Sequence, residues 1–133
     1  FRQEDVKRRG HAIEVRINAE NPAKMFMPSP GLVTGYAAPE GADVRFDTLL
    51  YEGYRIAPYY DSLVGKLIVW APDRAAAIAA LRTALSGLKV EGVHTTVPLH
   101  QALAADPEVG EGIFHTAWLE GWMAAGKLEA GRT

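Results

Sequence analysis

The sequence predicts an α+β fold in which helices pack against a mainly antiparallel β-sheet. Residues 11–19 alternate apolar and polar side chains, which is typical of a strand with one buried face. Residues 32–58 hold further short apolar runs separated by turn residues, and such short connections favour antiparallel pairing. Residues 73–88 repeat apolar side chains at helical spacing. A chain of 133 residues with 48% hydrophobic residues can bury one core, so we expect residues 1–133 to form a single domain.

The N-terminal part is expected to begin with a short helix over residues 3–9 that ends at Gly10, because glycine suits the left-handed position after a helix. The strand at 11–19 follows directly. Residues 20–31 contain three prolines, which predicts a loop. The apolar side chains of this loop are expected to enter the core: Met25, Phe26 and Met27.

Further strands are expected in the middle of the chain. Residues 32–38 and 43–50 are predicted to be strands joined by the turn at 39–42, and residues 52–58 form the next strand. Residues 65–71 are an almost continuous apolar run, which predicts a strand covered on both faces. Helices are expected to provide that cover.

The main helix is predicted at residues 73–88, where Asp73 can cap the N-terminus and many alanines raise the helix propensity. After a short strand at 89–93, a second helix is expected at 97–105.

The C-terminal part is expected to leave the second helix near residues 106–112 and to form a helical patch over 115–128. Trp118 and Trp122 lie one helical turn apart and are expected to anchor this patch to the sheet. The tail at 128–133 is expected to fray.

Composition argues against several classes of function. A net charge of −2 leaves no basic footprint for nucleic acid or for an anionic membrane. The absence of cysteine excludes disulfides, thiolate nucleophiles and zinc sites built on sulfur. The histidines show no HxH or HExxH spacing, and no glycine-rich phosphate loop follows a strand, so we expect neither a metal site nor nucleotide binding by this chain alone. The chain begins without Met and without a signal peptide, which indicates a piece of a longer protein.

Arg16 is the first candidate site residue. Glu14, Arg16, Asn18 and Glu20 share the polar face of the first strand. A guanidinium flanked by Glu14 and Asn18 would be oriented for a bidentate grip on a planar oxyanion. The alternative is an ordinary ladder of surface ion pairs, which contributes little stability.

The second candidate is the segment at residues 57–66, which contains Tyr59, Tyr60 and Asp61. Asp61 could orient a basic side chain such as Arg16, while the two tyrosines could form a wall against a flat ligand. The alternative is a structural corner in which Asp61 caps a turn and the tyrosines are half-buried packing residues.

Several segments together resemble one known family. They are GHAIEVRINAENP, MPSPGLVTGYAAPEG, VRFDT, PYYDSLVGKLIVW, AAIAALRTALSGLKVEGVHTT and TAWLE. In this order they resemble the C-terminal domain of biotin carboxylase, which follows the ATP-grasp domain in bacterial acetyl-CoA carboxylase. The same domain occurs in the biotin carboxylase parts of propionyl-CoA, methylcrotonyl-CoA and pyruvate carboxylases. The resemblance covers essentially the whole chain and implies that the preceding N-terminal and ATP-grasp domains are missing from it.

The resemblance implies a mechanism and a role for Arg16. Biotin carboxylase uses MgATP and bicarbonate to make carboxyphosphate, which yields CO2 to the N1′ nitrogen of biotin on a carrier protein. By this likeness Arg16 reaches the active site and stabilises the enolate-like oxygen of deprotonated biotin, a task that suits a fixed cation. Asp61 becomes a residue that supports Arg16 near the interface, and four more become candidate neighbours of the substrate: Glu14, Asn18, Tyr59 and Tyr60.

Three further positions take meaning from the same family. Arg45 matches an arginine of the dimer interface of bacterial biotin carboxylase. Ala42 stands where some relatives have an aromatic residue, which weakens the expectation of a strong dimer. Thr96 replaces an asparagine that is usual there, and we expect only a changed helix cap.

The resemblance also sets expectations for cofactors and partners. No cofactor is expected in this chain, whereas the longer protein is expected to use ATP, Mg and biotin on a carrier protein or domain. The expected partners are the N-terminal and ATP-grasp domains and a second copy of the longer protein, in the bacterial cytoplasm or, for a eukaryotic protein, in the mitochondrial matrix. The chain alone is expected to be inactive, and its sequence does not indicate which acyl-CoA or keto acid is finally carboxylated. The alternative is a structural or docking module that supports the ATP-grasp domain, the dimer or the carrier.

Overall fold

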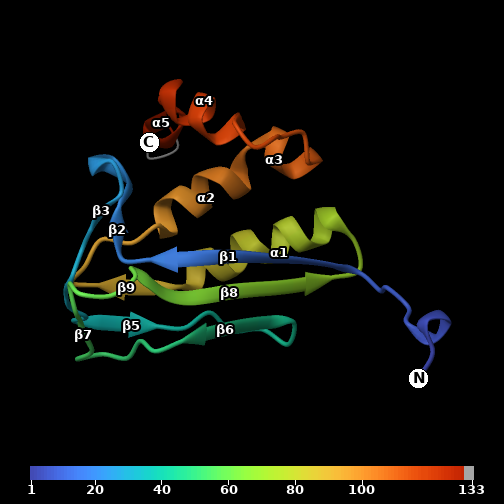
Figure 1. Cartoon of the computed structure of the whole chain (residues 1–133), viewed down its shortest axis with the longest axis horizontal. Helices are drawn as coiled ribbons and strands as arrows, with labels where there is room; N and C mark the ends of the chain where they lie inside the picture. Colours follow the sequence, from blue (N-terminus) through green and yellow to red (C-terminus); the bar gives the residue numbers. More distant parts are fainter. Residues whose placement is uncertain (131–133) are drawn as a thin grey trace.

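The computed structural model describes residues 1–130 and has the predicted α+β fold. Its main sheet is antiparallel, with the order β1 (His11–Asn18), β8 (Leu63–Ala71) and β6 (Val44–Thr48) (Figure 1). Short strands form three two-stranded sheets, which are also antiparallel. They are β2 (Glu20–Asn21) with β3 (Met27–Pro28), β4 (Gly31–Leu32) with β7 (Arg55–Ile56), and β5 (Gly35–Ala37) with β9 (Lys89–Glu91).

The helices lie along the sheet and beyond β1. The longest helix, α1 (Arg74–Gly87), packs on β8 and β1, and the shorter helices follow one another on the side of β1 away from β6 (Figure 1). They are α2 (Val97–Ala105), α3 (Pro107–Glu111), α4 (Trp118–Ala124) and α5 (Lys127–Ala130). Two 3₁₀ turns complete the described elements, η1 (Gln3–Asp5) and η2 (Pro22–Lys24).

The core lies between the sheet and α1. Asp73 caps α1 as predicted, because its Oδ1 accepts a hydrogen bond from the Ala76 N–H at 2.9 Å. Leu85 of α1 is fully buried with Ile17 and Leu67 of the sheet, which fixes the face of β1 that looks inward. The alternate residues Glu14 and Arg16 are therefore directed to the opposite, exposed face.

The predicted cover on both faces of residues 65–71 is wrong for the described residues. Leu67 and Val69 are buried beneath α1, but Lys66 and Ile68 on the other face are only half-buried and Trp70 is 41% exposed. A continuous apolar run is also compatible with an open sheet face, because the Lys66 side chain can carry its charge to solvent along an apolar stem and Trp70 Nε1 is satisfied by the Arg9 carbonyl at 3.1 Å.

Two predictions about the N-terminal part are wrong. Residues 3–9 form only η1, and Gly10 has a φ of 70° where the chain turns into β1 rather than at a helix end. Met25 and Met27 do not enter the core, since they are 93% and 58% exposed. Only Phe26 packs inward, against the second apolar cluster around Leu99, Trp122 and Leu128.

The hairpin predicted around the turn at 39–42 is also wrong. Residues 32–38 and 43–50 hold strands, but β5 pairs with β9 and β6 pairs with β8. Tyr36 lies opposite Val90, and Phe46 lies opposite Leu67. Each segment thus gains an apolar partner from a distant part of the chain instead of from its neighbour.

The C-terminal helices pack on α2 and not on the sheet as predicted. Trp122 lies in the cluster with Leu99, and its Nε1 donates to Asp106 Oδ2 at 2.8 Å. Residues 106–112 hold a missed helix, α3, which Asp106 caps. The predicted patch at 115–128 is divided into α4 and α5 at Gly126, and Leu128 is buried, so the expected tail is helical up to residue 130 and its residues 131–133 lie outside the described part.

No helix among residues 1–130 is long and apolar enough to cross a membrane. The same residues contain no group of three or more His, Asp or Glu side chains that could hold a metal ion.

Candidate functional site

Arg16 stands on the exposed face of β1, directly opposite Lys66 of β8, which lies in turn opposite Asp47 of β6. The Arg16 carbonyl accepts hydrogen bonds from α2, so Arg16 and Lys66 form a non-hydrogen-bonded pair, in which opposite side chains come closest. Within residues 1–130, the Arg16 guanidinium has no hydrogen bond or ion pair. The site therefore presents two neighbouring cations on one sheet face.

Asp47 does not neutralise this pair through a hydrogen bond. The Arg45 guanidinium binds the Asp47 carboxylate by two parallel contacts, Nε to Oδ1 at 2.9 Å and Nη2 to Oδ2 at 2.6 Å. This hydrogen bonding lowers the pKa of Asp47, to which the charge of Lys66 also contributes, and it raises the pKa of Arg45. Because Asp47 is engaged by Arg45, the face around Arg16 and Lys66 stays suited to an anion.

The expected orientation of Arg16 by Glu14 and Asn18 does not occur among the described residues. Glu14 is exposed and makes no hydrogen bond with Arg16. The Asn18 side chain donates from Nδ2 to Glu20 Oε1 at 3.2 Å, and the Ser62 hydroxyl donates to the same glutamate oxygen. The polar face of the first strand is thus divided into a free arginine and a separate cluster of Asn18, Glu20 and Ser62.

The backbone of Arg16 is held from the side by the start of α2. The Arg16 carbonyl accepts from the Thr96 hydroxyl at 3.2 Å and from His100 Nε2 at 2.8 Å. Thr96 also exchanges two bonds with Asn18: its hydroxyl accepts the Asn18 N–H at 3.0 Å, and its own N–H donates to the Asn18 carbonyl at 3.0 Å. Thr96 is the N-cap residue of α2 but makes no side-chain cap bond, because its hydroxyl is bonded to β1; the expected change of the helix cap stays a prediction.

The His100 imidazole is half-buried at this position. Burial lowers its pKa from the ordinary value of 6.5, and the hydrogen bond to the Arg16 carbonyl opposes that effect. Sequence reasoning gave Thr96 only a helix-cap role and did not single out His100 as a neighbour of Arg16. The spacing of Thr96 and His100 could have indicated that they act together, because residues four positions apart lie on the same face of a helix.

The segment with Tyr59, Tyr60 and Asp61 forms a turn before β8. Asp61 Oδ1 accepts from the Leu63 N–H at 2.7 Å, as the turn-capping interpretation requires, and no bond joins it to Arg16 within residues 1–130. The tyrosines are not half-buried packing residues, since Tyr59 is 87% and Tyr60 85% exposed. Arg45 and Ala42 are also exposed, on and just before β6 at the far edge of the sheet.

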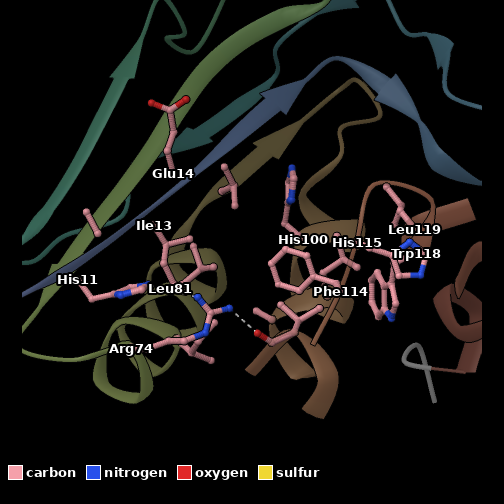
Figure 2. A pocket seen from close by; sticks show the side chains of 16 residues that line it. His11, Ile13, Glu14, Arg74, Leu81, His100, Phe114, His115, Trp118 and Leu119 are labelled. Atoms are coloured by element: carbon pink, nitrogen blue, oxygen red, sulfur yellow. Dashed lines mark hydrogen bonds between the residues drawn. The ribbon is translucent and has the colours of Figure 1, made fainter. Parts of the chain in front are cut away.

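A mainly apolar cavity of about 460 Å³ lies beside β1, between α1, α2 and the segment that follows α3 (Figure 2). Arg74 stands in its wall and is occupied, since it donates to the Val109 carbonyl at 2.6 Å and to the Gly110 carbonyl at 3.0 Å. Figure 2 shows the Glu14 carboxylate directed away from Arg74 and His100, at the rim of the cavity, and Arg16 is not among the lining residues.

The fold is an α+β domain with a pair of cations on an exposed sheet face, and comparison with known proteins gives its family. The family model of the biotin carboxylase C-terminal domain matches residues 14–121, and the chain belongs to this family. The resemblance stated from the sequence is thereby confirmed.

Its relatives include several biotin-dependent enzymes. The chain is 48% identical over 118 residues to the biotin carboxylase of Nostoc sp., covering 89% of this chain and 26% of that protein. It is 51% identical over 120 residues to the biotin carboxylase of Pseudomonas aeruginosa, covering 90% of this chain and 26% of the relative.

The solved structures agree. The biotin carboxylase domain dimer of Hydrogenobacter thermophilus 2-oxoglutarate carboxylase, in complex with MgADP, ADP and bicarbonate, matches with a TM-score of 0.90 and 43% identity. The match covers 92% of this chain and 27% of that one. The chain thus spans about a quarter of the length of these relatives.

Proposed function

We propose that this domain forms the biotin-facing part of a biotin carboxylase, in which Arg16 stabilises the negative charge that develops on the ureido oxygen of biotin. The observation that carries the proposal is the free Arg16 guanidinium beside Lys66 on an exposed sheet face, in a chain of this family. A fixed cation can stabilise a developing oxyanion without reorganising during the reaction.

In the proposed reaction, carboxyphosphate releases CO2 and phosphate, the phosphate takes the N1′ proton of biotin, and the deprotonated N1′ attacks CO2. Loss of the N1′ proton places negative charge on the ureido oxygen, and the Arg16 guanidinium is the group of this chain that would hold that oxygen. MgATP and bicarbonate are assigned to the preceding domains of the longer protein.

The longer protein is proposed to act as a dimer, to receive biotin on a carrier protein or domain, and to work in the bacterial cytoplasm, or in the mitochondrial matrix if it is eukaryotic. Support for a dimer comes from the solved 2-oxoglutarate carboxylase domain, which is described as one. Arg45 and Ala42 remain the proposed interface residues. Relatives of this chain serve pyruvate and 2-oxoglutarate carboxylases, so acetyl-CoA carboxylation and a role in fatty acid biosynthesis form one proposal among several.

The test is kinetic and uses the complete carboxylase that carries this domain. Arg16→Ala is expected to lower kcat for biotin carboxylation by about 10²–10³-fold, the usual cost of removing one oxyanion donor. Arg16→Lys should recover only part of the loss, because lysine keeps the charge without the planar fork. Arg55→Ala, which removes another exposed strand arginine, is the matched control.

The same variants separate the enzymatic role from a docking role. Unchanged kcat in Arg16→Ala, with weakened dimer or carrier binding, would contradict the proposal and favour the structural module. Loss of kcat with normal assembly, by size and by carrier binding, would support the catalytic role.

A further inference from the structure

The regular sheet pairing of the strand that carries Arg16 is interrupted after the next residue, Ile17. Arg16 lies opposite Lys66 and Ile17 opposite Gly65, but the register shifts between Ile17 and Asn18, where the partner becomes Leu63. The extra residue is Val64 of β8, and a β-bulge of this kind disrupts the local pairing of both strands. At this point β8 alone no longer determines the path of the β1 backbone.

The start of α2 makes hydrogen bonds to the backbone of β1 along the edge that faces away from β8. Thr96 is only 5% exposed, and it pairs with both the N–H and the carbonyl of Asn18, as a neighbouring strand would. His100 lies one helical turn further along and donates from Nε2 to the Arg16 carbonyl at 2.8 Å. Together the two side chains occupy both acceptor positions of that carbonyl.

The direction of these bonds matters for the site. They reach the Arg16 carbonyl in the plane of the sheet, whereas the Arg16 side chain leaves the strand across that plane. The contacts therefore hold the backbone and leave the guanidinium free. They also join the site to a helix far away in the sequence, which packs on α1 and contributes Leu99 to the Trp122 cluster.

We propose that Thr96 and His100 are positioning residues of the carboxylation site, which hold the β1 backbone at the bulge so that the Arg16 guanidinium meets the ureido oxygen of biotin. This inference rests on the proposed function of Arg16. Misplacing a catalytic group by about 1 Å costs on the order of 10²-fold in rate, so a modest backbone shift at the bulge has a measurable effect.

The test uses two pairs of variants in the complete carboxylase. Thr96→Val removes the hydroxyl at nearly constant shape, and Thr96→Ser keeps it. His100→Leu removes the donor, and His100→Gln keeps an N–H that can reach the same carbonyl. His94→Leu is the control, because its exposed side chain lies just before α2 and has no hydrogen bond within residues 1–130.

The expected result is a loss of about 10-fold or more in kcat for biotin carboxylation in Thr96→Val and in His100→Leu, by the cost of misplacement given above. KM for ATP and the rate of ATP hydrolysis without biotin should not change. Thr96→Ser and His100→Gln should restore most of kcat. A purely structural defect would lower all of these quantities together and would not depend on the donor.

Hydrogen exchange provides a second readout in the same proteins. In Thr96→Val and His100→Leu, exchange should accelerate in a peptide covering residues 14–19 and stay unchanged in one covering 66–71, which lies in β8. If His100→Leu fails to fold, the comparison of Thr96→Val with Thr96→Ser alone tests the positioning role.

Each outcome has a separate meaning. Normal kcat in both donor-free variants, with Arg16→Ala inactive, would overturn this inference and leave the proposed function standing. Normal kcat in Arg16→Ala would overturn both, whatever the exchange data show. Equal losses in the donor-free and donor-keeping variants would reduce Thr96 and His100 to packing residues and overturn the positioning role.

Discussion

Arg16 and Lys66 lie directly opposite each other on the antiparallel strands β1 and β8, so two cations share one row of the exposed sheet face. Like charges in directly opposite positions reduce the stability of a sheet. The Asp47 carboxylate at the end of the row is already bound by Arg45. The row therefore keeps an excess of positive charge beside the residue proposed to meet biotin.

Reversing the charge of Lys66 should disable Arg16. In Lys66→Glu the new carboxylate faces the guanidinium across the strands and competes with the substrate oxyanion for it. We expect kcat for biotin carboxylation in the complete enzyme to fall by roughly 10-fold, as estimated from an energy of about 1.4 kcal/mol. Lys89→Glu changes an exposed lysine of β9 and should have no effect. Equal kcat in both variants would remove Lys66 from the site.

His100 should make the stability of the domain depend on pH. Its pKa is lowered by burial, so the folded protein favours the neutral imidazole relative to the unfolded chain. The stabilisation is complete above the ordinary pKa of 6.5 and is lost as the pH falls below it, towards the folded pKa. Denaturant unfolding of the wild type should therefore weaken more between about pH 7 and pH 5 than that of His100→Gln.

The comparison with His100→Gln is needed because other ionisable side chains line the same cavity. These groups are His11, Glu14, Arg74 and His115. They are present in both proteins, so their effects cancel in the difference between the two curves. Parallel curves for the wild type and His100→Gln would show that His100 does not contribute.

The core beneath the site should be sensitive to truncation. Leu67 lies opposite Val15 and Phe46 in the central strand and is fully buried against α1. Leu67→Ala should lower the free energy of unfolding by about 2–5 kcal/mol, because a cavity is added to the lost transfer energy. Met25→Ala, at a residue that is 93% exposed, should change it by less than about 0.5 kcal/mol. Chemical denaturation of both variants measures the difference, and similar values would contradict this core.

The chain of residues 1–133 should be inactive by itself. It spans about a quarter of the length of its relatives, and its described residues offer no cluster of metal ligands for MgATP. Neither ATP hydrolysis nor carboxylation of free biotin is expected above background, and activity should appear when the missing N-terminal and ATP-grasp segment is added. Turnover of ATP by the chain alone would refute the proposed division of the site.

Elements with a strong local pattern could be predicted from the sequence. The alternation of residues 11–19 predicted β1, and Asp73 with the following alanines predicted α1, because side-chain alternation and helix capping depend only on near neighbours. The same alternation placed Arg16 on the exposed face. Its proposed role came from the family resemblance, since charge and periodicity alone also fitted a surface ion-pair ladder.

Strand partners could not be predicted in this way. The turn at 39–42 suggested a hairpin between the two strands beside it. In the structure Phe46 of β6 lies opposite Leu67 of β8, and Tyr36 of β5 lies opposite Val90 of β9, so each strand pairs with an apolar segment that is not its neighbour in the sequence. Trp122 likewise packed with Leu99 rather than on the sheet, since Asp106 offered its indole N–H a hydrogen-bond acceptor.

The sequence by itself determined the α+β class, the main strand and helix, the exposed position of Arg16 and the family of the chain. Only the tertiary structure decided what surrounds Arg16: Lys66 across the strand, Arg45 holding Asp47, and Thr96 and His100 on its carbonyl. These neighbours could not be predicted because they are far from Arg16 along the chain. Thr96 and His100 are separated from Arg16 by 80 and 84 positions, and no local pattern reports a hydrogen bond that forms only when a sheet and a helix pack together.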